Sequence, residues 1–152
     1  MHNHSMKTAI MTISLTLAML SAPVAVAHKG ASGVVKQRMK AMTRMEKALR
    51  PLNAMEKGKR EFDSATLRAA AEKLLDEAQR IPELFPAGSL KPPSEASEEI
   101  WKNFPSFTGH ARQLRDNLLR LRTVDEFDFP QALQAVRLSC KKCHERFRIE
   151  KE

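Results

Sequence analysis

Cysteine is scarce in this chain: Cys140 and Cys143 are the only two among 152 residues. A structural zinc site needs four ligands, usually from two Cys or Cys/His pairs, and no second pair with regular spacing is present. A redox pair of the thioredoxin type would need a βαβ setting, and no stretch of the sequence reads as a strand. A disulfide between the two residues fits their spacing but is awkward on a regular helix. These three alternatives stay open, with little to support them.

Aromatic residues are also few, since seven Phe and one Trp are all that the chain contains. The net charge is +8, but the bases are spread along every predicted helix and form no recognised nucleic-acid motif, so we expect no nucleic-acid partner. We interpret the excess of bases as solvated helix faces, with an acidic partner or an anionic membrane face as the alternative. The chain also lacks paired carboxylates, a nucleophile beside a base and a phosphate-binding loop. We therefore expect it not to be an enzyme.

A long apolar run occurs only near the N-terminus, from Ala9 to Leu20. Lys7 precedes it and Ala25-Val26-Ala27 follows it, which is the pattern of a secretory signal with its cleavage site. The run is too short to span a bilayer, so an uncleaved membrane anchor is the weaker alternative. We predict a signal peptide over residues 1–27, cleaved after Ala27, and one periplasmic domain over residues 28–152 without stable membrane insertion.

The most informative feature that is present is the run Cys140-Lys141-Lys142-Cys143-His144, close to the C-terminal end. C-x-x-C-H is the attachment signature of a c-type haem, in which two thiols form thioethers with the porphyrin and the imidazole binds the iron. On a helix, Cys140 and His144 stand one turn apart, with Cys143 on the same side. We therefore predict one covalent haem c per chain, held by Cys140 and Cys143, with His144 as an iron ligand. Such attachment takes place outside the bacterial cytoplasm, in agreement with the predicted export.

Four amphipathic helices are predicted after the signal peptide, at about 33–55, at 64–80, from the break before Pro105 to about 122, and at 128–147, with a short extra helix at 98–103. Mostly short connections favour an all-α fold, an antiparallel four-helix bundle with the haem on its C-terminal helix and the first helix over it. Pro51 is expected to bend or loosen the first helix. Apolar residues at helical spacing predict the buried faces: Val35, Met39, Met42, Leu49 and Leu52 in the first helix, Leu67, Ala71, Leu74, Leu75 and Ala78 in the second, Phe107, Ala111, Leu114, Leu118 and Leu121 in the third, and Leu133, Val136, Cys140, Cys143 and Phe147 in the fourth.

Over essentially all of the predicted mature domain, the chain resembles the class II c-type cytochromes, that is cytochrome c′ and its low-spin relatives. The resemblance implies a four-helix bundle with a covalent haem near the C-terminus, as the periodicity also predicts. The C-terminal run is its specific part, and the other matches support it by their order and spacing. The matching pieces are Val34-Val35-Lys36-x-Arg38, Lys57-Gly58 with Phe62-Asp63, Leu84-Phe85-Pro86, Glu99-Ile100-Trp101 and Cys140-Lys141-Lys142-Cys143-His144-x-x-Phe147-Arg148.

The resemblance also implies a role for the residue four after the first-helix arginine. In cytochrome c′ proper an apolar residue there shields a five-coordinate iron that binds nitric oxide or carbon monoxide, whereas in the low-spin relatives a methionine there ligates the iron. Counting four from Arg38 gives Met42. Met39 and Met45 are each three residues from Met42, so a small rotation of the helix would substitute one of them, and Met39 is kept as a further cofactor-binding candidate. An open distal face is the remaining alternative.

Two arginines complete the implied site. Arg38 matches the pocket arginine of the family, which lies near a haem propionate; its alternative is an ordinary surface base. Arg148, one turn after His144, matches an arginine that flanks the proximal face of the haem. A cation there would disfavour a protonated imidazole.

The sequence therefore predicts a periplasmic electron-transfer cytochrome with His144 and Met42 as axial ligands, which exchanges electrons with redox partner proteins. The first alternative is a five-coordinate cytochrome c′-type protein that binds a diatomic gas, nitric oxide or carbon monoxide. The second is a haem-free helical interaction protein in which Cys140 and Cys143 bind metal or pair. Many members of the family dimerise through their first two helices, so a homodimer is a further expectation from the resemblance.

Overall fold

The computed structural model describes residues 31–149. The predicted signal peptide over 1–27, its cleavage site after Ala27 and the start of the domain at residue 28 lie outside the described residues. Within 31–149 there is no strand, and one isolated antiparallel bridge joins Ala96 to Arg148. No helix in that part of the chain is both long and apolar enough to cross a bilayer.

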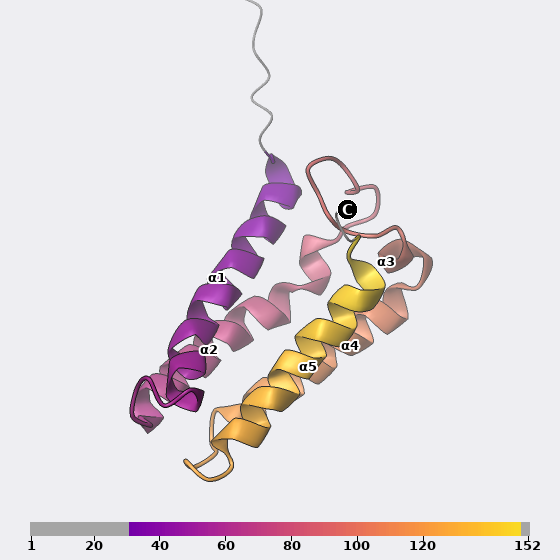
Figure 1. Ribbon diagram of the computed structural model, residues 1–152. Helices are drawn as coiled ribbons and strands as arrows, with labels where there is room; N and C mark the ends of the chain where they lie inside the picture. Colours follow the sequence, from indigo (N-terminus) through magenta and orange to yellow (C-terminus); the bar gives the residue numbers. More distant parts are fainter. Residues whose placement is uncertain (1–30, 150–152) are drawn as a thin grey trace, which may run out of the picture.

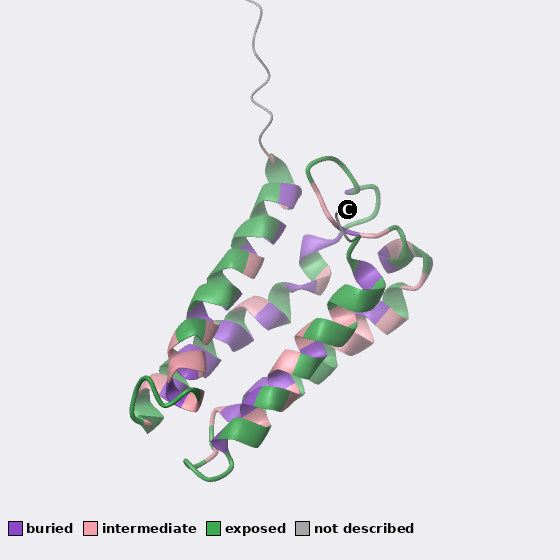
Figure 2. Cartoon of the chain, viewed as in Figure 1, coloured by how far each residue is buried: buried purple, intermediate pink, exposed green. Residues whose placement is uncertain are grey.

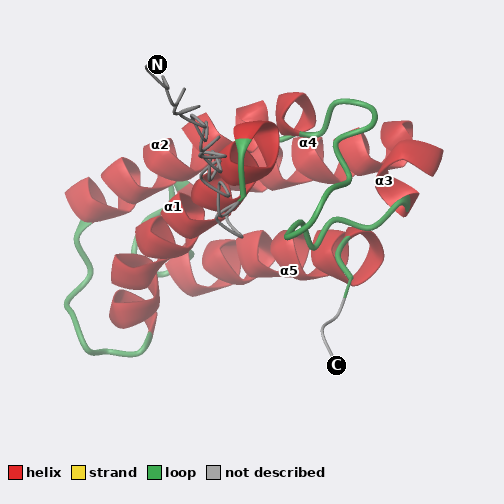
Figure 3. Cartoon of the chain, turned by 90° about the horizontal axis from the view of Figure 1, so that it is seen from above, coloured by secondary structure: helices red, strands yellow, loops and turns green. Residues whose placement is uncertain are grey.

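The predicted antiparallel four-helix bundle is confirmed (Figures 1 and 3). Its main contacts join α1 to α2, α2 to α4 and α4 to α5, whereas α1 meets α5 over a much shorter contact. The loop that precedes α3 and the C-terminal end of α5 lie together at one end of the bundle (Figure 1). The elements are α1 (Gly33–Glu56), α2 (Ser64–Arg80), the 3₁₀ helix η1 (Pro82–Leu84), α3 (Glu99–Lys102), α4 (Phe104–Leu121) and α5 (Phe129–Phe147).

Local sequence signals explain where these helices begin. The Asp63 side chain accepts hydrogen bonds from the amides of Ala65 and Thr66 and so caps α2, because the first amides of a helix have no partner inside it. Asn103 caps α4 in the same way, and α4 therefore starts at Phe104 with Pro105 in its first turn, slightly earlier than predicted. Proline is tolerated there because its missing N–H would be unpaired anyway. The sequence predicted a loop where η1 forms.

The buried face of α1 differs from the prediction. Met39 is 46% exposed, and Met42 and Leu49 are only half-buried. Val35 and Leu52 are buried as predicted, but the buried stripe also includes Ala41, Met45 and Ala48, so the face turned to the core is rotated from the predicted one. α1 continues through Pro51 to Glu56. The buried residues are Val35, Arg38, Ala41, Met45, Ala48, Leu52 and Met55.

The other three stripes agree with the prediction. Every residue predicted for the buried faces of α2 and α4 is buried, and so are Leu133, Val136 and Phe147 of α5. All of them except Ala71 belong to one continuous core, whose members lie on the helix faces turned toward the bundle interior (Figure 2). Cys140 and Cys143 are half-buried at the margin of that core. The core therefore fixes α5 in rotation and leaves its two cysteines partly accessible.

Candidate haem-binding site

The two cysteines of α5 are free thiols that pack against the core. Burial raises the pKa of the Cys140 thiol, and it raises the pKa of Cys143 to about 11, with Cys140 adding a smaller effect. Desolvation has this effect because it disfavours the charged thiolate. Both groups are therefore neutral thiols at neutral pH. They lie one turn apart on a regular helix and are not joined by a disulfide.

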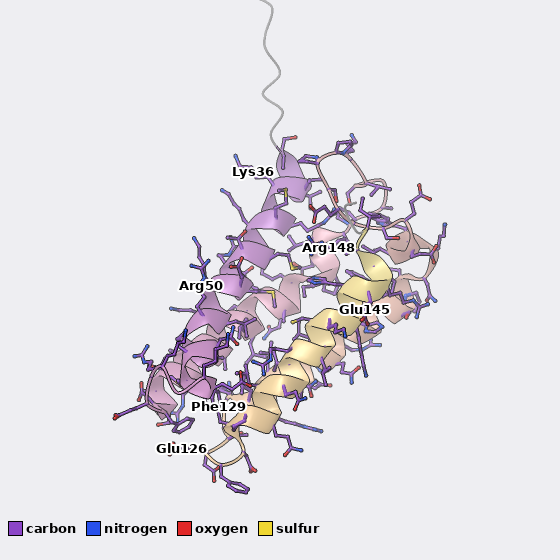
Figure 4. All side chains as sticks on the ribbon, in the orientation of Figure 1. Lys36, Arg50, Glu126, Phe129, Glu145 and Arg148 are labelled. Carbon is purple, nitrogen blue, oxygen red and sulfur yellow. The ribbon has the colours of Figure 1, made fainter. Side chains whose placement is uncertain are left out.

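His144 directly follows Cys143, one turn after Cys140 on α5, and is exposed at the surface. Partial desolvation against the surrounding protein lowers its pKa, and the charge of Arg148 lowers it further. The second effect has the direction that the sequence predicted. A lowered pKa keeps the imidazole neutral at neutral pH, so a ring nitrogen retains the lone pair that a metal ion needs. Figure 4 shows Arg148 on the end of α5, at the same end of the bundle as Lys36 near the start of α1.

An ion pair at the opposite end of the bundle shows which sides of α1 and α5 face each other. Arg137 of α5 donates to the carboxylate of Glu56 at 2.6 Å and to the side-chain oxygen of Asn53 at 3.2 Å, and both acceptors lie on α1. His144 comes two turns after Arg137 on α5, and Met42 comes about three turns before Asn53 on α1. With 3.6 residues per turn, each pair shares one side of its helix. The side of α1 that carries Met42 therefore faces the side of α5 that carries His144.

The three candidate methionines of α1 have different surroundings. Met39 lies outside the core and lines a surface hollow with Lys36, Lys40 and other polar residues. Met45 is 6% exposed and belongs to the core. Met42 is half-buried at the edge of the core. The structure thus brings Met42 to the side facing α5, buries Met45 among core residues and leaves Met39 at the surface.

Arg38 is buried, 5% exposed, so the alternative of an ordinary surface base is wrong. Its guanidinium donates to the carbonyl of Leu84 from Nε and Nη2, to Ser89 Oγ at 2.9 Å and to Ser94 Oγ at 2.7 Å. Cζ also lies 3.9 Å from the centre of the Phe85 ring. Burial lowers the pKa of Arg38. No carboxylate within residues 31–149 forms an ion pair with it, although a buried cation normally has an anionic partner.

The residues present fit a haem c. Two free, half-buried thiols stand on one helix with a neutral imidazole one turn on, a thioether lies on the facing helix, and a buried cation lacks a carboxylate. A haem would supply that anion through its propionates. For the zinc alternative, no three His, Cys, Asp or Glu side chains gather to hold a metal ion in the described part of the chain.

Sequence reasoning missed the residues that hold the two arginines. Ser89 and Ser94 bind Arg38, and the carboxylate of Glu95 binds Arg148. All three lie in the loop before α3, which carries no periodic pattern. One signal was available for Arg38: it lies on the stripe of α1 at helical spacing from Val35, and a charged residue on a buried stripe indicates a buried charge.

The chain is similar to known cytochromes over nearly all of its described length. The family model for cytochrome C′ matches residues 33–148. The cytochrome c-556 of Agrobacterium fabrum is 30% identical over 141 residues, which are 91% of this chain and 96% of that protein. The structure of cytochrome c′ from Rhodopseudomonas palustris superposes with a TM-score of 0.75 at 28% identity, covering 80% of this chain and all of that one. The nitric oxide complex of a mutant cytochrome c′ from Alcaligenes xylosoxidans superposes with a TM-score of 0.72 at 28% identity, covering 78% of this chain and 94% of that one.

The family match extends from the first residue of α1 to the residue after α5, and so includes all four long helices. It also includes the C-x-x-C-H run and Arg38. Proteins of this family are electron carriers or gas-binding haem proteins rather than typical enzymes. The chain belongs to the cytochrome c′ family of c-type haem cytochromes, as its sequence predicted.

Proposed function

We propose that the protein is a periplasmic electron-transfer cytochrome with one haem c, attached through Cys140 and Cys143, and with His144 and Met42 as axial ligands. Export would use the signal peptide over residues 1–27, and redox partner proteins would deliver and accept the electron. The observation that carries the proposal is the position of Met42. It is the half-buried methionine on the side of α1 that faces the side of α5 carrying His144.

The surroundings of the proposed ligands suit this role. When bound, a haem c supplies an iron that changes between the ferric and ferrous states, and a thioether ligand raises its reduction potential. Cys140 and Cys143 would fix the group to α5, while the core beneath them excludes water from one side. The neutral imidazole of His144 would bind without first losing a proton. Arg38, already held by Leu84 of η1 and by two loop serines, would offer its charge to a propionate without reorganising.

The optical spectrum of the purified holoprotein tests the ligand assignment. We expect a low-spin ferric spectrum with the weak charge-transfer band of methionine bound to iron, and we expect Met42→Ala to abolish that band and raise the spin state. Met39→Ala is the matched control on the same helix, because its side chain lies at the surface, and it should leave the spectrum unchanged. A high-spin wild-type spectrum that Met42→Ala does not alter would refute the assignment.

A gas-binding protein is the second candidate. The observation that favours it is the likeness to the cytochrome c′ from Alcaligenes xylosoxidans, whose mutant was solved as a nitric oxide complex. The half-buried, apolar side chain of Met42 would then shield the distal face rather than ligate the iron. Rapid, tight binding of carbon monoxide to the ferrous wild-type protein would support this function. Inertness of the wild type, together with carbon monoxide binding in Met42→Ala, would support the electron-transfer function instead.

A further inference from the structure

The C-terminal end of α5 is tied to the loop before α3 by main-chain hydrogen bonds. The amide of Ser97 donates to the carbonyl of Phe147, and the amide of Ile149 donates to the carbonyl of Glu95, both at 2.9 Å. Between these bonds lies the bridge of Ala96 to Arg148. The backbone of Glu95 is therefore held in place beside the residue that follows the last turn of α5.

The side chain of Glu95 adds a bond to the same place. Arg148 donates to one carboxylate oxygen of Glu95 twice, from Nε at 2.8 Å and from Nη2 at 2.5 Å. An exposed ion pair is usually weak because ordering two long side chains costs entropy. Here the main chain already holds both residues next to each other, so less freedom is lost. The guanidinium of Arg148 is thus given one defined position.

That position matters because Arg148 lies beside His144. The Arg148 amide donates to the His144 carbonyl at 3.0 Å, one helical turn away, and the charge of the guanidinium acts on the imidazole ring. The preceding loop residue reaches the opposite helix: Ser94 Oγ accepts from Arg38 on α1. Two consecutive loop residues therefore hold the two cations on either side of the candidate haem site.

We propose that Glu95 is a positioning residue for the proximal side of the haem: it holds the Arg148 guanidinium beside His144 and thereby sets the electrostatic environment of the proximal ligand. This inference rests on the proposed ligation by His144. Glu95 acts on the ligand through Arg148, because its carboxylate partly neutralises the guanidinium and also fixes the position of that positive charge. Loss of the carboxylate should leave a stronger and less ordered positive charge beside the ligand, which favours the ferrous state.

The test uses haem-loaded, full-length protein and four variants: Glu95→Gln, Arg148→Gln, the two combined, and Glu145→Gln. Glu145→Gln is the charge-matched control, because Glu145 follows His144 directly and pairs with Lys141 at 3.5 Å rather than with Arg148. The readouts are the midpoint reduction potential and the hyperfine-shifted proton resonances of the His144 ring in the ferric protein. Equal helical content of all variants shows that the fold is kept.

We expect Glu95→Gln to raise the midpoint potential and to move the His144 resonances. In the Arg148→Gln background, Glu95→Gln should shift the midpoint potential and the His144 resonances no more than Glu145→Gln does. An equal effect of Glu95→Gln with and without Arg148 would overturn the proposal, because the carboxylate would then act directly. An effect of Glu95→Gln no larger than that of Glu145→Gln would also overturn it. A wild-type protein without hyperfine-shifted His144 resonances would instead refute the ligation itself, before any variant is compared.

Discussion

Replacing Arg38 by alanine should cost the bundle about 3–5 kcal/mol of unfolding free energy. The carbonyl of Leu84 would lose the two hydrogen bonds that it accepts from Arg38, and Ser89 Oγ would lose the one that it accepts. Each buried group left unpaired costs about 1–3 kcal/mol. Two buried methylenes of the side chain would also be lost, at about 0.8 kcal/mol each. Relief of the cost of desolvating the guanidinium offsets part of this sum. The hydrogen bonds and the packing therefore outweigh the cost of burying the charge.

Urea unfolding of the haem-loaded protein, followed by helical circular dichroism, measures this difference. Arg38→Met separates the two contributions, because it keeps the apolar stem and loses the hydrogen bonds; it should cost about 1.5 kcal/mol less than Arg38→Ala. Arg50→Ala is the control on the same helix, since Arg50 is exposed and forms an ion pair with Glu46 one turn away. A loss below about 1 kcal/mol for Arg38→Ala would refute the reasoning, and so would a loss equal to that of Arg50→Ala.

Two further substitutions test the core and one ion pair. In the same urea assay, Leu118→Ala should lower the unfolding free energy by about 2–5 kcal/mol, because its side chain is fully buried and a cavity would remain. The adjacent Leu119→Ala is the control and should change this free energy little, because the Leu119 side chain is 41% exposed. Glu56→Gln should be less stable than the wild type at neutral pH, because the hydrogen bonds from Arg137 lower the pKa of Glu56 in the folded protein. That stabilisation is present above the pKa of an unfolded Glu and is lost as pH falls through the lower folded pKa. The urea midpoints of the wild type and Glu56→Gln should therefore converge as the pH is lowered through this range. A difference between the two midpoints that does not change with pH would contradict the assignment.

The sequence predicted the parts of this structure that depend on neighbouring residues. The start of α2 follows from Asp63, whose side chain caps residues two and three positions away, and the C-x-x-C-H run acts within two turns of one helix. The buried face of α1 was predicted only in part: Val35 and Leu52 are buried, but Met39, Met42 and Leu49 are not, because packing against other helices decides which of several adjacent apolar stripes faces inward. Contacts between residues far apart in the sequence leave no periodic pattern in it. The loop residues that bind Arg38 and Arg148 lie about 50 residues away from them and could not be found by spacing.

The loop that reaches both α1 and α5 has a consequence for the order of folding. The helical hairpins α1–α2 and α4–α5 join residues close in sequence, whereas the bonds from Arg38 to Ser94, from Arg148 to Glu95 and from Arg137 to Glu56 span 56, 53 and 81 residues. Contacts of large sequence separation close long loops, and they form late because the entropy of closure is lost before the contact repays it. The surroundings of Met42 and His144 depend on these late contacts. We therefore expect the two hairpins to assemble first and the contacts around the candidate haem site to form later.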